Sequence, residues 1–88
     1  MQYSQCTPEQ RVAIFNDRIE ELERQHVERD ITITELRGRI NIATQKKDKL
    51  KIENYGVCLE EALREQEEVE QVIRLTVAER DEVIKQGM

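Results

Sequence analysis

The sequence predicts an all-α fold built as a coiled coil, and three observations support this prediction. Charged residues make up 38% of the 88-residue chain and aromatic residues only 3%, a profile typical of long helices rather than compact globules. The chain has a single proline and three glycines, so few residues interrupt a helix. Apolar residues recur three and four positions apart, which is the spacing of one helix face. Because so short and polar a chain buries little surface alone, we expect a second copy or another protein to complete its core.

A first long helix is predicted over residues 8–53, after a flexible tail of residues 1–6. Thr7 can accept a hydrogen bond from a free N–H of the first turn, and Pro8 suits the first helical position because its missing N–H has no partner there. Gln10 stands three residues after Thr7, which is the spacing of a capping box. These residues mark the N-terminus of the helix.

Residues 7–57 carry heptads with β-branched side chains at one position and leucine recurring at the other. This combination favours a parallel two-stranded coil, so the chain is predicted to form a homodimer. Polar residues at His26, Lys47 and Asn54 would weaken this seam and fix its register, whereas Gly38 falls on the outer face. The predicted oligomer seam comprises Val12, Phe15, Ile19, Leu22, Ile33, Leu36, Ile40, Leu50 and Val57.

The heptads change phase after Val57, because the apolar stripe that begins at Leu59 is displaced by two residues. Insertions of three or four residues only overwind or unwind a coil, and a displacement of two matches neither. We therefore expect a break or hairpin turn at residues 54–56, where Asn54 and Gly56 tolerate a helix C-cap. A hairpin there would bring Ile73 close to Asn41. The alternative is one continuous bent helix, since no Ser, Thr or Asp caps a helix that starts at residue 57.

A second helix is predicted over residues 57–86, within an acidic segment of residues 58–88. Residues 57–88 hold nine acids and four bases, so 4 − 9 = −5 accounts for the whole net charge of −5. The glutamates could form a face that docks on a basic surface, or simply a solvated helix face. This candidate partner face comprises Glu60, Glu61, Glu65, Glu67, Glu68 and Glu70.

Two other patterns suggest chemistry, and each has a simpler structural interpretation. The basic run from Lys46 to Lys51 could contact phosphates, but it contains Asp48, and a solvated helix face is the favoured interpretation. Glu23 and His26 have the i, i+3 spacing of a di-iron ligand pair. The seam around them offers Leu22 and Arg29 instead of further carboxylates, which favours a register-setting histidine.

No other motif points to catalysis or to a cofactor. The sequence has no glycine-rich phosphate loop and no nucleophile beside a base, so we predict a protein that is not an enzyme and that uses no metal or cofactor. No stretch is long and apolar enough to span a membrane, and the net negative charge disfavours nucleic-acid binding. Cys6 and Cys58 are not in metal-ligand spacing, and reduced thiols predict a cytoplasmic location.

Three stretches, "RIEELERQ" (18–25), "LEEALREQEEVEQ" (59–71) and "LTVAERDEVIKQ" (75–86), resemble in style the short coiled-coil accessory proteins encoded by tailed bacteriophages. The resemblance implies a small protein of the host cytoplasm that binds and redirects a host factor, and it carries no functional residues over. The sequence thus predicts a homo-oligomeric coiled-coil interaction protein that binds a protein partner. The alternative is an acidic inhibitor of a nucleic-acid enzyme or a DNA-binding protein, acting through residues 60–70.

Overall fold

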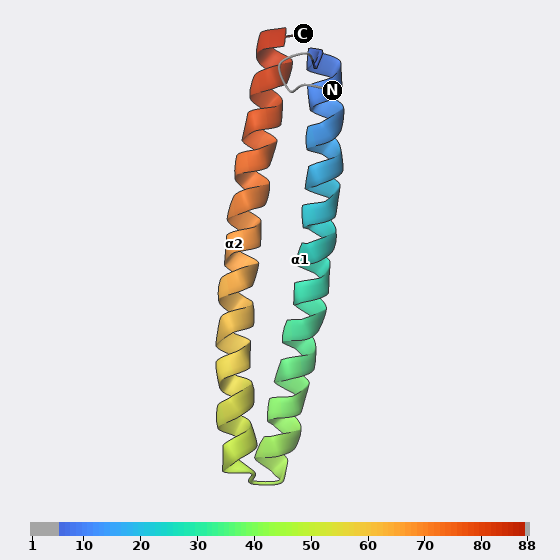
Figure 1. The fold of residues 1–88 in the computed structure, drawn as a ribbon. Helices are drawn as coiled ribbons and strands as arrows, with labels where there is room; N and C mark the ends of the chain where they lie inside the picture. The colour runs from blue at the N-terminus through green and yellow to red at the C-terminus, as the bar shows by residue number, and fades with distance from the viewer. Residues whose placement is uncertain (1–5, 88) are drawn as a thin grey trace.

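The chain folds as an antiparallel hairpin of two helices in the computed structural model, which describes residues 6–87 (Figure 1). Helix α1 spans Pro8–Gln45 and helix α2 spans Lys49–Gly87. The two helices lie side by side along their length, so the ends of the hairpin opposite the turn meet (Figure 1). The molecule measures 60 × 18 × 17 Å, and a 38-residue helix accounts for about 57 Å of this length. The all-α prediction is confirmed, and the alternative of one continuous bent helix is wrong.

Helix α1 begins as the sequence predicts. The backbone N–H of Gln10 donates to Oγ1 of Thr7 at 3.2 Å, and the N–H of Thr7 donates to Oε1 of Gln10 at 2.9 Å. This reciprocal pair is a capping box, and Pro8 occupies the first turn. The predicted tail of residues 1–6 lies outside the described residues except for Cys6.

The turn of the hairpin lies at residues 46–48, eight residues earlier than predicted. Lys47 adopts a left-handed conformation with φ of 58°. Its N–H donates to the carbonyl of Thr44 at 3.1 Å, and the N–H of Asp48 donates to the carbonyl of Ala43 at 3.0 Å. These two bonds form a Schellman motif, which satisfies the last carbonyls of α1. A lysine thus occupies the position where a glycine is the usual residue, and this hides the turn in the sequence.

Asp48 starts the second helix. Its backbone carbonyl accepts a hydrogen bond from the N–H of Ile52 at 3.1 Å, and its Oδ1 accepts one from the N–H of Lys51 at 3.3 Å. Aspartate is a preferred N-cap residue, because its side chain satisfies a free N–H of the first turn. Residues 54–56 lie inside α2, so the predicted boundaries at 53 and 57 are wrong. The missing N-cap at residue 57 was the sequence evidence against that location.

The two helices share an apolar seam with a regular three-four repeat on each side. In α1 the seam positions are 12, 15, 19, 22, 26, 29, 33, 36, 40 and 43, and in α2 they are 52, 55, 59, 62, 66, 69, 73, 76, 80 and 83; all are buried or half-buried. The best-buried apolar side chains are Ile19, Ile33, Ala43, Ala62 and Val69. The predicted displacement of two residues between the repeats is present, and the three-residue turn absorbs it.

Most of the predicted oligomer seam packs within one chain rather than between copies. Its α1 members occupy the seam that faces α2 and are buried or half-buried. Leu50 and Val57 are 67% and 58% exposed. Their positions continue the apolar repeat of α1, whereas the seam of α2 is displaced from that repeat by two residues. The prediction that these two residues share the seam is wrong, and the residues assigned to a parallel dimer instead form an antiparallel intrachain contact.

Candidate functional site

A polar layer interrupts the apolar seam near the middle of the hairpin. His26 and Arg29 occupy two consecutive seam positions of α1, and Gln66 occupies the facing position of α2. Nε2 of Gln66 donates to Oδ1 of Asp30 at 2.7 Å and to the backbone carbonyl of His26 at 3.2 Å. The layer therefore joins the two helices through polar contacts within a mostly apolar seam. A second polar contact lies nearer the chain ends, where Nη1 of Arg80 donates to Oδ1 of Asn16 at 3.0 Å.

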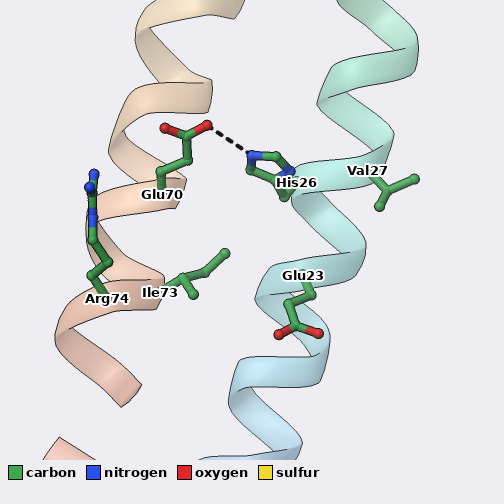
Figure 2. Close-up of a pocket in the computed structure, with 6 residues that line it drawn as sticks. All are labelled: Glu23, His26, Val27, Glu70, Ile73 and Arg74. Carbon is green, nitrogen blue, oxygen red and sulfur yellow. Dashed lines mark hydrogen bonds and ion pairs between the residues drawn. The ribbon is translucent and has the colours of Figure 1, made fainter. Parts of the chain in front are cut away.

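Two acidic side chains of α2 complete this layer from either side. Nε2 of His26 lies 3.0 Å from Oε1 of Glu70 (Figure 2), and Arg29 pairs with Glu65. Glu65 and Glu70 are five residues apart, which places them about 140° from each other around the helix. They flank opposite edges of the seam, so a hydrogen bond on one side and an ion pair on the other lie on either side of Gln66.

The polar layer is not fully satisfied. Nε of Arg29 and Oε1 of Gln66 are buried without a hydrogen-bond partner among the described residues. A buried polar atom without a partner costs about 1–3 kcal/mol. The layer therefore lowers stability relative to an apolar seam, while its polar contacts link particular residues of the two helices.

A shallow groove lies beside the polar layer and is lined by Glu23, His26, Val27, Glu70, Ile73 and Arg74 (Figure 2). The hairpin thus brings Ile73 beside Glu23 and His26, so the predicted approach of Ile73 to Asn41 is wrong because the turn occurs earlier. Val27 points away from α2, and the carboxylate of Glu23 points away from the imidazole of His26 (Figure 2). The ligand pair considered from sequence does not converge on one point.

No group of three or more His, Cys, Asp or Glu side chains within residues 6–87 could hold a metal ion. His26 faces Glu70 at 3.0 Å and Asp30 at 3.9 Å, which is the role of a seam histidine with acidic neighbours. These contacts are those of a polar seam residue, and the register-setting role of His26 stays a prediction.

The six glutamates of the candidate partner face do not share one surface. Glu65 and Glu70 contact α1 through Arg29 and His26. The remaining four, Glu60, Glu61, Glu67 and Glu68, are exposed and make no ion pair among the described residues. The acidic surface available to a partner is therefore smaller than the sequence predicts.

The basic run from Lys46 to Lys51 occupies the turn end of the hairpin (Figure 1). Nζ of Lys51 lies 3.9 Å from Oδ2 of Asp48, and the guanidinium of Arg39 lies 5.9 Å from the centre of the Tyr55 ring. Residues 37–57, which form this end on both sides of the turn, hold six bases and two acids, so 6 − 2 = +4 is its net charge.

Many large apolar side chains remain outside the seam. Those that are 40–67% exposed are Ile14, Val27, Ile31, Ile42, Leu50, Val57, Leu63, Val72, Leu75 and Ile84. Single exposed apolar residues are ordinary on protein surfaces, but here ten large ones are exposed and only five apolar residues are almost fully buried. Neither helix, across residues 6–87, has a stretch long and apolar enough to cross a membrane.

Comparison of the chain with protein-family models, with curated proteins and with solved structures found no match.

Proposed function

We propose that this chain is a non-enzymatic, homo-oligomeric coiled-coil protein that acts by binding a protein partner in the cytoplasm. The observation that carries the proposal is the set of ten large apolar side chains that stay exposed on a thin hairpin. Two helices alone bury little surface per residue. A hairpin that presents apolar side chains along its length gains stability when another protein covers them.

The polar layer supports a role in interaction. Its polar contacts favour one alignment of the two helices and so one spacing of the side chains presented on their outer faces. A rod with fixed spacing can recognise a partner through several shallow contacts at once. The exposed charges between the apolar residues would then give specificity rather than affinity.

Sedimentation velocity over a concentration series tests the homo-oligomeric part. We expect the sedimentation coefficient to rise with concentration towards the value of a dimer. A coefficient that stays at the value of one hairpin at every concentration would refute self-association.

Affinity capture from the native host lysate tests partner binding, with Leu50→Glu and Leu75→Glu as matched variants. Both residues are 67% exposed and lie outside the seam, so neither change disturbs it; they stand 25 residues apart on α2. We expect at least one protein to bind the unmodified chain and to be lost with one of these variants. The same set of captured proteins from all three chains would contradict recognition through the exposed apolar residues of α2.

The alternative function, an acidic inhibitor of a nucleic-acid enzyme or DNA-binding protein, is favoured by the four exposed glutamates without ion pairs. Replacing Glu60, Glu61, Glu67 and Glu68 by glutamine would then abolish binding to a basic partner, and added salt would weaken binding by the unmodified chain. Binding that is insensitive both to salt and to these changes would exclude this alternative.

A further inference from the structure

An apolar stripe runs along the outer face of α1, away from α2. At about 100° per residue, Val27, Ile31, Gly38 and Ile42 lie within about 60° of one another around the helix. Val27, Ile31 and Ile42 are 57%, 54% and 54% exposed, and Val27 points away from α2 (Figure 2). We call these four residues, together with Thr34 between them, the outer stripe. Helix α1 therefore has two apolar faces, and α2 covers only one of them.

Gly38 has no explanation within the hairpin. It does not adopt a positive φ, and a Cβ atom added to it would have no neighbour within 4 Å. Glycine inside a helix costs about 1 kcal/mol relative to alanine. Glycine allows another backbone or side chain to approach the helix closely. Within the hairpin no other group approaches Gly38 in this way.

The outer stripe is complementary to itself when two copies pack in antiparallel. A two-fold axis that passes between Thr34 and Glu35, at position 34.5, relates residues whose numbers sum to 69. Val27 of one copy then faces Ile42 of the other, since 27 + 42 = 69. Ile31 faces Gly38, since 31 + 38 = 69, and the large side chain meets the open position. Contact of this kind is isologous, because both copies contribute the same surface.

The charges beside the stripe fit the same arrangement. On one flank Glu28, which also pairs with Arg24 of its own helix, lies within about 3 Å of the height of Arg39 from the second copy, measured along the helix axis. On the other flank Asp30 is equally close in height to Arg37 of the second copy, although its Oδ1 already accepts a hydrogen bond from Gln66. Opposite charges at such flanking positions favour one register over others. Glu35 lies beside the axis and would approach its own copy, which is the unfavourable contact of this arrangement.

We propose that the chain forms an antiparallel two-fold dimer through the outer stripe of α1, with Ile31 of each copy seated against Gly38 of the other. The proposal rests on the proposed function only for self-association, and it assigns that association to a surface distinct from the seam. The turn ends of the two hairpins point in opposite directions. The surface of α2 outside the seam stays available for another partner.

Sedimentation of surface variants tests the location of the interface. We expect Ile31→Glu to weaken self-association by roughly tenfold or more, as for a residue at the centre of an interface. We expect Gly38→Leu to abolish it although leucine favours helix, since the side chain fills the space that Ile31 needs. Leu75→Glu is the matched control, because it removes an exposed leucine from α2 and should leave the dimer intact. Circular dichroism checks that each variant keeps its helix content.

Disulfide cross-linking tests the direction and register, in a background in which Cys6 and Cys58 are replaced by serine. A mixture of Val27→Cys and Ile42→Cys chains should yield a cross-linked pair containing one chain of each kind. Val27→Cys alone should yield much less, because the two positions 27 lie about 22 Å apart along the axis of an antiparallel pair.

The possible outcomes separate this inference from the proposed function. A dimer that persists with Ile31→Glu and Gly38→Leu overturns the outer stripe as the interface and leaves self-association standing. Efficient cross-linking of Val27→Cys to itself overturns the antiparallel register. A chain that stays monomeric at every concentration overturns both this inference and the homo-oligomeric part of the proposed function.

Discussion

Gln66 of α2 donates a 2.7 Å hydrogen bond from Nε2 to Oδ1 of Asp30 on α1, and Gln66 occupies a buried position of a mostly apolar seam. The bond crosses the hairpin between residues that are 36 positions apart in the sequence. Oε1 of the same side chain is buried without a partner. Gln66 therefore links the two helices through one side-chain atom and destabilises their contact through the other.

Gln66→Leu should raise the free energy of unfolding by about 1 kcal/mol or more. The change removes a buried atom without a partner, which costs about 1–3 kcal/mol, and adds an apolar side chain to the seam. The side chain of Asp30 is 63% exposed, so water can replace the lost bond. Denaturant unfolding measures the difference, with the exposed Gln71→Leu as control. A less stable Gln66→Leu variant would show that the hydrogen bond to Asp30 contributes more free energy than the unpartnered Oε1 costs.

Ile33→Ala should lower the free energy of unfolding by about 2–5 kcal/mol, the cost of truncating a buried aliphatic side chain. Ile33 is 6% exposed, whereas Leu75 is 67% exposed, so Leu75→Ala should change stability by only a few tenths of a kcal/mol. Thermal and chemical unfolding of both variants give the comparison. Similar losses from both would contradict the intrachain seam.

Lys47→Gly and Gly56→Ala should both stabilise the chain, each by up to about 1 kcal/mol. Lys47 has a positive φ that glycine adopts without strain, and Gly56 lies inside α2 with open space where a Cβ would stand. If the turn lay at residues 54–56, both signs would reverse, because a glycine would enter a helix and an alanine would enter a turn. The melting temperatures of the two single variants therefore locate the turn.

The carboxyl group of Glu21 should titrate below its usual range. Its hydrogen bond with Arg24 lowers the pKa, and the positive charge of Arg24 acts in the same direction. A carboxylate with a lowered folded-state pKa contributes stability that is present above its unfolded pKa and is lost as the pH falls through the folded value. NMR titration of Glu21 should therefore show a higher midpoint in Arg24→Gln than in the unmodified chain. Unchanged midpoints would show that the pair does not persist in solution.

The sequence by itself determined the class of the fold, the start of α1 and the two-residue phase displacement. These features depend on local signals: Thr7 and Gln10 cap the helix that they begin, and the three-four apolar spacing fixes which face of each helix is buried. Local signals also placed Gly38 on the outer face of α1. They could not reveal what covers that face, because the residues that would do so come from another molecule.

Only the tertiary structure decided where the chain turns and what the first seam packs against. Leu50 and Val57 continue the α1 repeat past the turn, so periodicity alone carries the first helix too far. The turn depends instead on Lys47 in a left-handed conformation and on Asp48 as the N-cap of α2, both set within a run of lysines that looks helical. The seam residues of α1 suit a second copy as well as α2, because each requires only an apolar face with the same repeat. The three-residue turn favours the intrachain contact over a contact between two copies, because closing a short loop costs less entropy than associating two chains.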